Sequence, residues 1–248
     1  MSGVLSRGAL SGGLLSMMWR DLLFAHWPVA PGTVADRLPE RLSVDTHDGD
    51  AYLGVVPFVM ADIGPRGLPL GLSFGELNLR TYVTVDGDPG VYFFTLDADD
   101  RVGVRIARSV FQLPYYRAEM DVRTQGSGRD REVRFRSRRT NTDAPTAAFD
   151  ATYGPNGSFS APEPGSEAAF LAERYRFYTT DDDGRLYHGD VDHEPWSLAP
   201  GRAEIRENGL FDASGFDEPD GKPLLHFAAP VEVTAGRIHR PSSRDTAY

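Results

Sequence analysis

The residues best suited to chemistry lie in one stretch, LSFGELNLRTYV, at positions 72–83. If this stretch is a strand, its side chains alternate between two faces. Glu76, Asn78 and Arg80 then share one face, with an aromatic residue at each end of the row. A carboxylate, an amide and a guanidinium in a row could bind an anion or move a proton.

Two interpretations of this row differ in what its face meets. A polar face turned toward water is the commonest pattern in antiparallel sheets. That interpretation would also expose the flanking Phe74 and Tyr82, and it would leave the opposite face poor in large apolar groups. Because Glu76 and Arg80 lie about 13 Å apart at ~3.3 Å per residue, each would need another partner if buried. We favour an interior or cleft with a polar centre and an aromatic rim.

A second candidate is the stretch ARSVFQLPYYRAEM, positions 107–120. Apolar residues four apart over positions 102–110 predict a short helix, which Arg108 would end, and Pro114 would set a bend that displays Tyr115 and Tyr116. Tyrosine hydroxyls can donate to an oxyanion but are poor bases at their ordinary pKa. The alternative is that the tyrosines begin the next strand and one of them only packs.

Glu173 is a third candidate, in FLAERYRFY at positions 170–178. A helix that ends in a strand could hold Glu173 inward as the partner of an arginine. The alternative is a surface salt bridge with a neighbouring arginine, worth under about 1 kcal/mol.

The histidines suggest binding rather than a metal site. His188 and His193 are five residues apart and would lie on opposite faces of a strand, and no H-E-x-x-H pattern occurs. We therefore predict no metal, and a His193 that hydrogen-bonds in a core or cleft beside Trp196. His26 lies within an apolar run, which is typical of a core histidine.

Other known templates are absent from the sequence. It contains no G-x-S-x-G, no P-loop and no dinucleotide-binding glycine pattern. It also lacks cysteine, which excludes disulfides, thiolate metal sites and a cysteine nucleophile.

The elements that must position these residues are mostly strands. Positions 22–122 read as short apolar or alternating runs between turn signals, and AYLGVVPFVMADI at 51–63 is apolar enough for a strand buried on both faces. In REVRFRSRR, positions 131–139, apolar residues alternate with arginines, which predicts a strand with one solvated basic face. Ser166 is placed to cap a helix that starts at Glu167.

Composition and charge limit the partners. The chain has 248 residues, of which 40% are hydrophobic, enough for a sizeable core in one domain. A net charge of −10 opposes nonspecific nucleic-acid binding. No stretch approaches the roughly 20 apolar residues of a membrane helix. We expect a cytoplasmic protein with a single domain at 19–240 and flexible segments at 1–18 and 241–248.

Several motifs, taken in order, resemble the YqjF-like family of unknown function, a branch of the acetoacetate decarboxylase-like superfamily. They are LLFAHWPV, LPERLSVDT, AYLGVVPFVM, FGELNLRTYV, GVYFFTLDA, ARSVFQLPYYRAEM, FLAERYRFY, HEPWSL and HFAAPVEV. The resemblance implies a β-rich α+β domain: an antiparallel barrel-like or cone-shaped sheet with a few short helices, enclosing a polar pocket. It also implies that Glu76 occupies the position of an active-site glutamate of the decarboxylases.

The resemblance breaks where the decarboxylases carry their Schiff-base lysine, in a stretch reading roughly Arg-Glu-x-x-x-x-Pro-Lys-Lys. Here Arg108 and Pro114 match, but Tyr115 and Tyr116 stand in place of the two lysines. A phenol cannot form an imine, and Lys222, the sole lysine of the chain, lies outside any matching motif. We expect no decarboxylation through an imine, and no cofactor.

The resemblance and the residues together predict a pocket for a small anionic oxo or carboxylic acid. Arg80 and Arg108 would clamp the carboxylate, Tyr115 would donate to an oxyanion, and Glu76 or Glu173 would act as the base. The further substrate-binding residues that we predict are Asn78, Tyr116, His26 and His193. Lyase, isomerase or hydratase chemistry would suit this set.

Two alternatives remain open at this point: a binding or sensing module without turnover, and a buried polar network that only fixes strand register. Relatives in the superfamily assemble, so the resemblance also implies a possible homo-oligomer.

Overall fold

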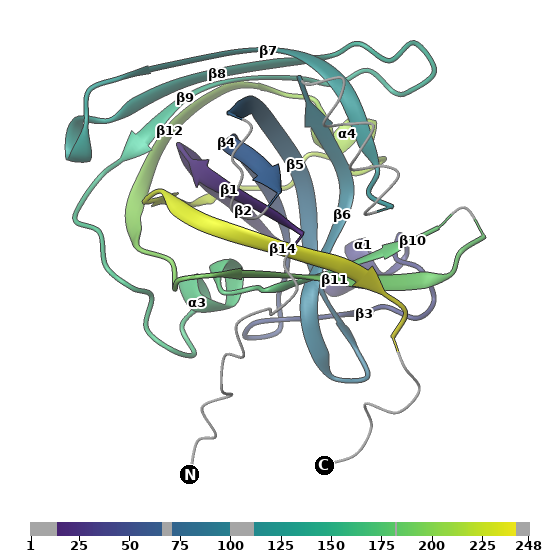
Figure 1. Ribbon diagram of the computed structural model, residues 1–248. Coiled ribbons are helices and arrows are strands. Elements are labelled where there is room, and N and C mark those ends of the chain that lie inside the picture. Colours follow the sequence, from purple (N-terminus) through teal and green to yellow (C-terminus); the bar gives the residue numbers. More distant parts are fainter. Residues whose placement is uncertain (1–13, 66–70, 100–111, 182, 242–248) are drawn as a thin grey trace.

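The computed structural model describes residues 14–65, 71–99, 112–181 and 183–241, which form a strand-rich molecule (Figure 1). Its strands are β1 (Leu15–Arg20), β2 (Leu22–Val29), β3 (Ser43–Val44), β4 (Ala51–Pro65), β5 (Leu72–Val85), β6 (Asp88–Ala98), β7 (Tyr115–Gln125), β8 (Glu132–Arg139), β9 (Ala148–Pro155), β10 (Arg176–Thr180), β11 (Leu186–His193), β12 (Leu198–Asn208), β13 (Leu224–Ala228) and β14 (Val231–His239). Its helices are short: α1 (Pro31–Ala35), η1 (Gly128–Asp130), α3 (Glu167–Ala172) and α4 (Leu210–Ala213).

These strands form one sheet that closes on itself in two rings. The first ring runs β4, β1, β14, β11, β10, β6, β5 and returns to β4; the second runs β4, β2, β13, β12, β9, β8, β7, β6, β5. The rings share β4, β5 and β6. Figure 1 shows β7, β8, β9 and β12 arching over one side, with β14 and β11 crossing the other. The predicted β-rich class with a closed sheet is confirmed, although β6 pairs in parallel with both β7 and β10.

A tight hairpin joins two of the shared strands, β5 and β6. Its two loop residues, Asp86 and Gly87, have φ values of 53° and 86°, as a turn that follows the twist of the strands requires. The pairing then shifts register between Leu79 and Arg80 on β5. Such a bulge bends the strand and re-aims the side chains beside it, and here it lies in the row of polar residues.

The two rings differ in what fills them. Apolar side chains pack the second ring, among them Leu77 and Leu79 from β5, Phe135 from β8 and Phe149 from β9, each at most 1% exposed. The alternate residues of β5, which carry the polar groups, point instead into the first ring. The tightly packed core of the second ring therefore lies directly behind β5, which forms one wall of the first ring.

Three sequence predictions about elements are confirmed. β4 is almost wholly buried from Ala51 to Val59, and β8 alternates buried residues with exposed arginines. Ser166 caps α3, where its hydroxyl accepts a 3.2 Å hydrogen bond from the amide of Ala169.

Two further predictions concern a helix over 102–110 and the start of the domain at residue 19. The helix predicted over 102–110 lies outside the described residues. The predicted boundary at residue 19 falls inside β1, which begins at Leu15 because Met17 and its neighbours pair with β4 and β14. Positions 15–18, predicted to be flexible, are therefore part of the sheet.

Within the described part of the chain, no helix has the length and apolar character needed to cross a membrane.

Candidate functional site

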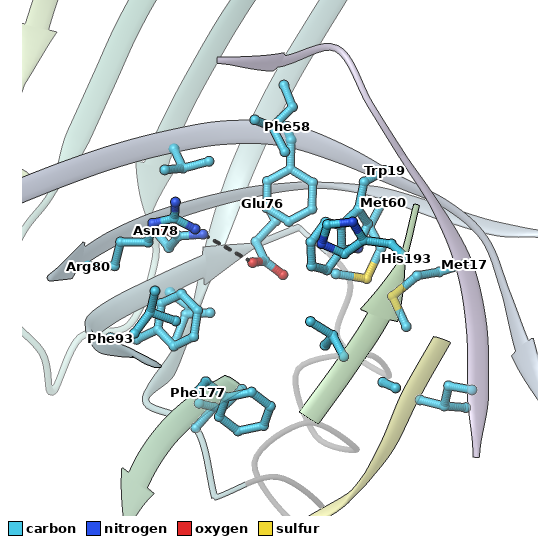
Figure 2. A pocket seen from close by; sticks show the side chains of 18 of the residues that line it. Met17, Trp19, Phe58, Met60, Glu76, Asn78, Arg80, Phe93, Phe177 and His193 are labelled. Carbon is cyan, nitrogen blue, oxygen red and sulfur yellow. Dashed lines mark hydrogen bonds between the residues drawn. The ribbon is translucent and has the colours of Figure 1, made fainter. Parts of the chain in front are cut away.

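A cavity of about 320 Å³ lies inside the first ring. The polar row of β5 forms part of its wall: Glu76, Asn78 and Arg80 all line it. Figure 2 shows the Glu76 carboxylate reaching into the open space between Phe93 and Phe177 on one side and His193 on the other. The row therefore faces the inside of a cavity rather than the outer surface of the sheet.

Glu76 is the most strongly perturbed acid of the site. It is 3% exposed, and it accepts a 2.6 Å hydrogen bond from the Tyr115 hydroxyl and a 3.5 Å contact from the Asn78 amide. Burial raises its pKa to about 7, although both of these donors favour the carboxylate and lower the pKa. At neutral pH Glu76 is thus able both to give and to accept a proton.

Arg80 contributes the positive charge of the row. Its Nη2 donates to the carbonyl of Leu171 at 3.0 Å and to the hydroxyl of Tyr82 at 3.2 Å, and its guanidinium lies 5.1 Å from the centre of the Phe24 ring. Among the described residues it pairs with no carboxylate, and its buried Nε has no hydrogen-bond partner. A half-buried cation without a counter-ion favours an anion in the adjoining space.

A hydrogen-bonded group behind the wall holds Arg80 in place. The Tyr82 hydroxyl donates to the Leu171 carbonyl at 2.6 Å and lies 2.6 Å from Nε2 of His26. Since that hydroxyl has a single proton, Nε2 of His26 is the donor in the second bond. Burial, and then the charge of Arg80, lower the pKa of His26 well below its usual value, so the ring is neutral.

Two further arginines line the cavity but are already neutralised. Arg174 pairs with Asp45 at 2.7 Å, and Arg176 pairs with Asp190 at 2.7 Å and with Asp88. Arg80 thus differs from them in lacking a carboxylate partner in the described part of the chain.

His193 lines the cavity and packs within a cluster of aromatic side chains. Its Nδ1 lies 2.7 Å from the carbonyl of Glu194, a bond in which the nitrogen must be the donor. The ring centres of Tyr175 and Trp196 lie 4.7 and 4.8 Å from that of His193. Trp19, 6.1 Å away, also lines the cavity, and its buried Nε1 lacks a hydrogen-bond partner among the described residues.

The structure brings five of the predicted site residues to the cavity wall: Glu76, Asn78, Arg80, Tyr115 and His193. Tyr115 and Glu76 are 39 residues apart in sequence and meet because β7 begins beside β6, with Tyr115 paired to Leu96.

Three predicted residues are not among those that line the cavity. His26 is fully buried behind the wall, bonded to Tyr82. Tyr116 alternates to the other face of β7, where the Arg139 guanidinium lies 4.0 Å from its ring centre. Glu173 follows the end of α3, and its carboxylate accepts hydrogen bonds from the Trp196 amide and the Tyr175 hydroxyl. Arg108 lies outside the described residues.

Sequence reasoning missed much of the wall. It did not place Arg174 and Arg176 there, although their spacing by two in a strand-like stretch puts both on one face. It also missed two apolar residues of the wall: Met17, which lies in the segment 1–18 expected to be flexible, and Trp19, at the first position of the predicted domain.

The described residues contain no group of three or more His, Cys, Asp or Glu side chains arranged to hold a metal ion.

Comparisons with known proteins identify the family of the chain. The DUF2071 family model, described as an uncharacterized conserved protein, matches residues 16–232. The uncharacterized protein YqjF of Bacillus subtilis (strain 168) is 41% identical over 223 residues, which is 89% of each chain.

Several solved structures have a fold similar to that of this chain. The acetoacetate decarboxylase-like enzyme of Sphingomonas wittichii RW1 has a TM-score of 0.62 at 14% identity, covering 98% of both chains. The enduracididine biosynthesis enzyme MppR, complexed with pyruvate, has a TM-score of 0.63 at 13% identity, covering 94% of this chain and 92% of its own. Acetoacetate decarboxylase of Legionella pneumophila has a TM-score of 0.61 at 12% identity, covering 93% and 88%. At such identities these likenesses show the fold alone. The chain belongs to the DUF2071 family, and it has the fold of the acetoacetate decarboxylase-like proteins.

Proposed function

We propose that the cavity binds a small organic acid, an oxo or carboxylic acid, through Arg80. The observation that carries the proposal is a half-buried guanidinium that lines the cavity and has no carboxylate partner among the described residues. A bound carboxylate would supply the missing counter-ion through charge-assisted hydrogen bonds. Asn78, whose buried Oδ1 also lacks a partner there, lies between Arg80 and Glu76 on the same face.

Chemistry on such a ligand would use Glu76 as the proton-transfer group. A carboxyl with a pKa of about 7 is suited to general acid–base catalysis near neutral pH. Tyr115 would stabilise its ionised form and could donate to a developing oxyanion after Glu76 takes up a proton. Lyase, isomerase or hydratase reactions next to a carbonyl need no more than these parts.

An imine route is not part of this proposal. Lys222 is exposed and is not among the residues that line the cavity. The motif resemblance aligns Tyr115 with the first lysine of the decarboxylases, and a phenol cannot form an imine. MppR, which shares the fold, is found in complex with pyruvate. That complex supports a 2-oxo acid as the first ligand to test.

A second candidate function is binding or sensing without turnover. It is favoured by the bonding of Glu76, since both carboxylate oxygens already have protein partners. In this case the acid would bind at Arg80 and leave unchanged.

Calorimetric titration with pyruvate and acetoacetate at pH 7 tests the proposal. We expect binding to weaken at least tenfold in Arg80→Met, and to be unchanged in Arg138→Met, which removes an exposed arginine of β8. Equal affinity of both variants would refute the role of Arg80. Following a bound acid by NMR then separates the candidates: loss of substrate that disappears in Glu76→Gln indicates an enzyme, and an unaltered ligand indicates a binding module.

A further inference from the structure

The cavity wall changes character along β5. The pairing of β5 with β4 orders its residues: Arg80 lies opposite Gly54, Asn78 opposite Val56, Glu76 opposite Phe58, Phe74 opposite Met60, and Leu72 opposite Ile63. The three polar residues are thus consecutive on the cavity face, and they are followed only by apolar pairs. Every second residue of β5 from position 72 to 80 lines the cavity.

The neighbouring strand β1 extends the apolar end. Its residue Leu15 lies opposite Pro65 of β4 and Ala235 of β14, and Trp19 lies opposite Met60. Leu15, Met17 and Ala235 all line the cavity. Figure 2 shows Met17 and Met60 on the far side of Glu76 from Arg80, in agreement with the strand pairing.

The size of the cavity exceeds what a three-carbon acid would fill. About 320 Å³ corresponds to roughly ten water-sized groups at ~30 Å³ each. Pyruvate has six heavy atoms, so an acid of that size at Arg80 would leave the apolar end without contacts. Apolar walls that face an empty space lose their dispersion contacts outright.

The apolar end also reaches the surface. Leu72 is 41% exposed, the one large hydrophobic side chain so exposed among the described residues, and it lines the same cavity. A chain or ring that extends from the polar end would therefore pass along apolar contacts up to the opening.

We propose that the ligand is an amphipathic acid, whose carboxylate or oxo-acid head lies at Arg80, Asn78 and Glu76. An apolar chain or ring of about five or more carbons then lies along Phe74, Met60 and Leu72. This inference rests on the proposed function and adds the class of ligand. The aromatic and methionine side chains of the wall suit such a tail because they offer large, adaptable apolar surfaces.

The test compares ligands that share a head and differ in tail. Each buried methylene adds about 0.8 kcal/mol, or nearly fourfold in affinity. We expect 2-oxooctanoate, with five methylenes more than pyruvate, to bind at least about thirtyfold more tightly in a calorimetric titration at pH 7. Its methyl ester, which keeps the tail and removes the charge, should bind at least about tenfold more weakly than the acid.

A variant of the apolar end supplies the second measurement. Ala235→Leu fills space at the end opposite to Arg80, so we expect it to abolish most of the preference for 2-oxooctanoate and to leave pyruvate binding unchanged. Thr234→Val, at the next residue of β14 on the opposite face, should keep the preference. Retained pyruvate binding in Ala235→Leu also shows that the variant is folded.

The outcomes separate the two proposals. If pyruvate binds as tightly as 2-oxooctanoate, the amphipathic ligand is refuted while the acid-binding function stands. If the methyl ester binds as well as the acid, the head is not recognised and the inference fails. If neither acid binds, the proposed function fails and the inference fails with it.

Discussion

The proton-transfer capacity of the site resides in one side chain. The carboxylate of Glu76 is removed from water, and among the described residues the hydroxyl of Tyr115 and the amide of Asn78 are the groups that lower its pKa. Arg80, four residues along β5, is too far away to restore the usual pKa. Desolvation therefore dominates, and the acid titrates near neutral pH.

This shift makes the stability of the protein depend on pH. The folded pKa of Glu76 is about 7, against an ordinary value of 4.5, so between these values the folded state binds a proton that the unfolded state has lost. The contribution to stability is full below pH 4.5 and is lost as pH rises through 7. Glu76→Gln stays neutral at every pH. The stability of this variant relative to wild type should therefore rise by roughly 2.5 kcal/mol between pH 5 and pH 8.

Urea unfolding at pH 5 and pH 8 measures this difference. Parallel changes in the wild type and in Glu76→Gln would show that Glu76 titrates at its ordinary pKa in the folded protein.

The Tyr115 hydroxyl holds the pKa of Glu76 down. It donates to Oε2 at 2.6 Å, which favours the ionised form. In Tyr115→Phe we expect the pKa of Glu76 to rise further above 7, as followed by the carboxyl carbon signal in an NMR titration. The matched control is Tyr116→Phe on the other face of β7, which should leave the titration of Glu76 unchanged. A lower pKa in Tyr115→Phe would contradict the assigned hydrogen bond.

At the scale of elements, the site depends on a hairpin and a short helix. The β5–β6 turn sets the pairing, and the register shift at Leu79 and Arg80 re-aims the polar row. The helix α3 supplies the carbonyl of Leu171, which accepts hydrogen bonds from both Arg80 and Tyr82. A helix of six residues is too short to be stable alone, so its cap and its packing must hold it.

The cap of α3 can be tested with a built-in control. Ser166 accepts a hydrogen bond from the Ala169 amide, so Ser166→Ala should lower the free energy of unfolding by about 1 kcal/mol. Ser127 stands at the same position before η1 but makes no side-chain cap bond. Ser127→Ala should therefore leave the urea midpoint unchanged. Equal effects of the two substitutions would show that the hydroxyl of Ser166 does not stabilise the helix.

At the scale of the molecule, one ring of the sheet is packed and the other holds a cavity. Phe135 is fully buried in the packed ring, whereas Phe93 lines the cavity and is only half-buried. Phe135→Ala should cost about 3–5 kcal/mol of stability, because it removes contacts on all sides and leaves a new void. Phe93→Ala should cost clearly less, since part of its surface already borders open space.

Urea unfolding measures the free energy of unfolding of both variants. The two values can be compared directly if the free energy falls with urea concentration at the same rate in each variant. If Phe93→Ala cost as much as Phe135→Ala, the first ring would be as tightly packed as the second.

The sequence by itself determined the local features. Alternation placed Glu76, Asn78 and Arg80 on one face, the continuous apolar run predicted the buried strand β4, and the position of Ser166 predicted the start of α3. These follow from periods of two and 3.6 residues and from capping, which act over a few positions. The motif resemblance also carried the family and the fold, which the comparisons bear out.

Only the tertiary structure decided what the polar face meets. Closure of the sheet into two rings turned that face toward a cavity, brought Tyr115 to Glu76, and left His26 and Glu173 outside the cavity wall. A strand pattern shows which side chains share a face, but the space opposite that face is set by pairings between distant strands. Those pairings depend on how the whole sheet closes, which no local period encodes.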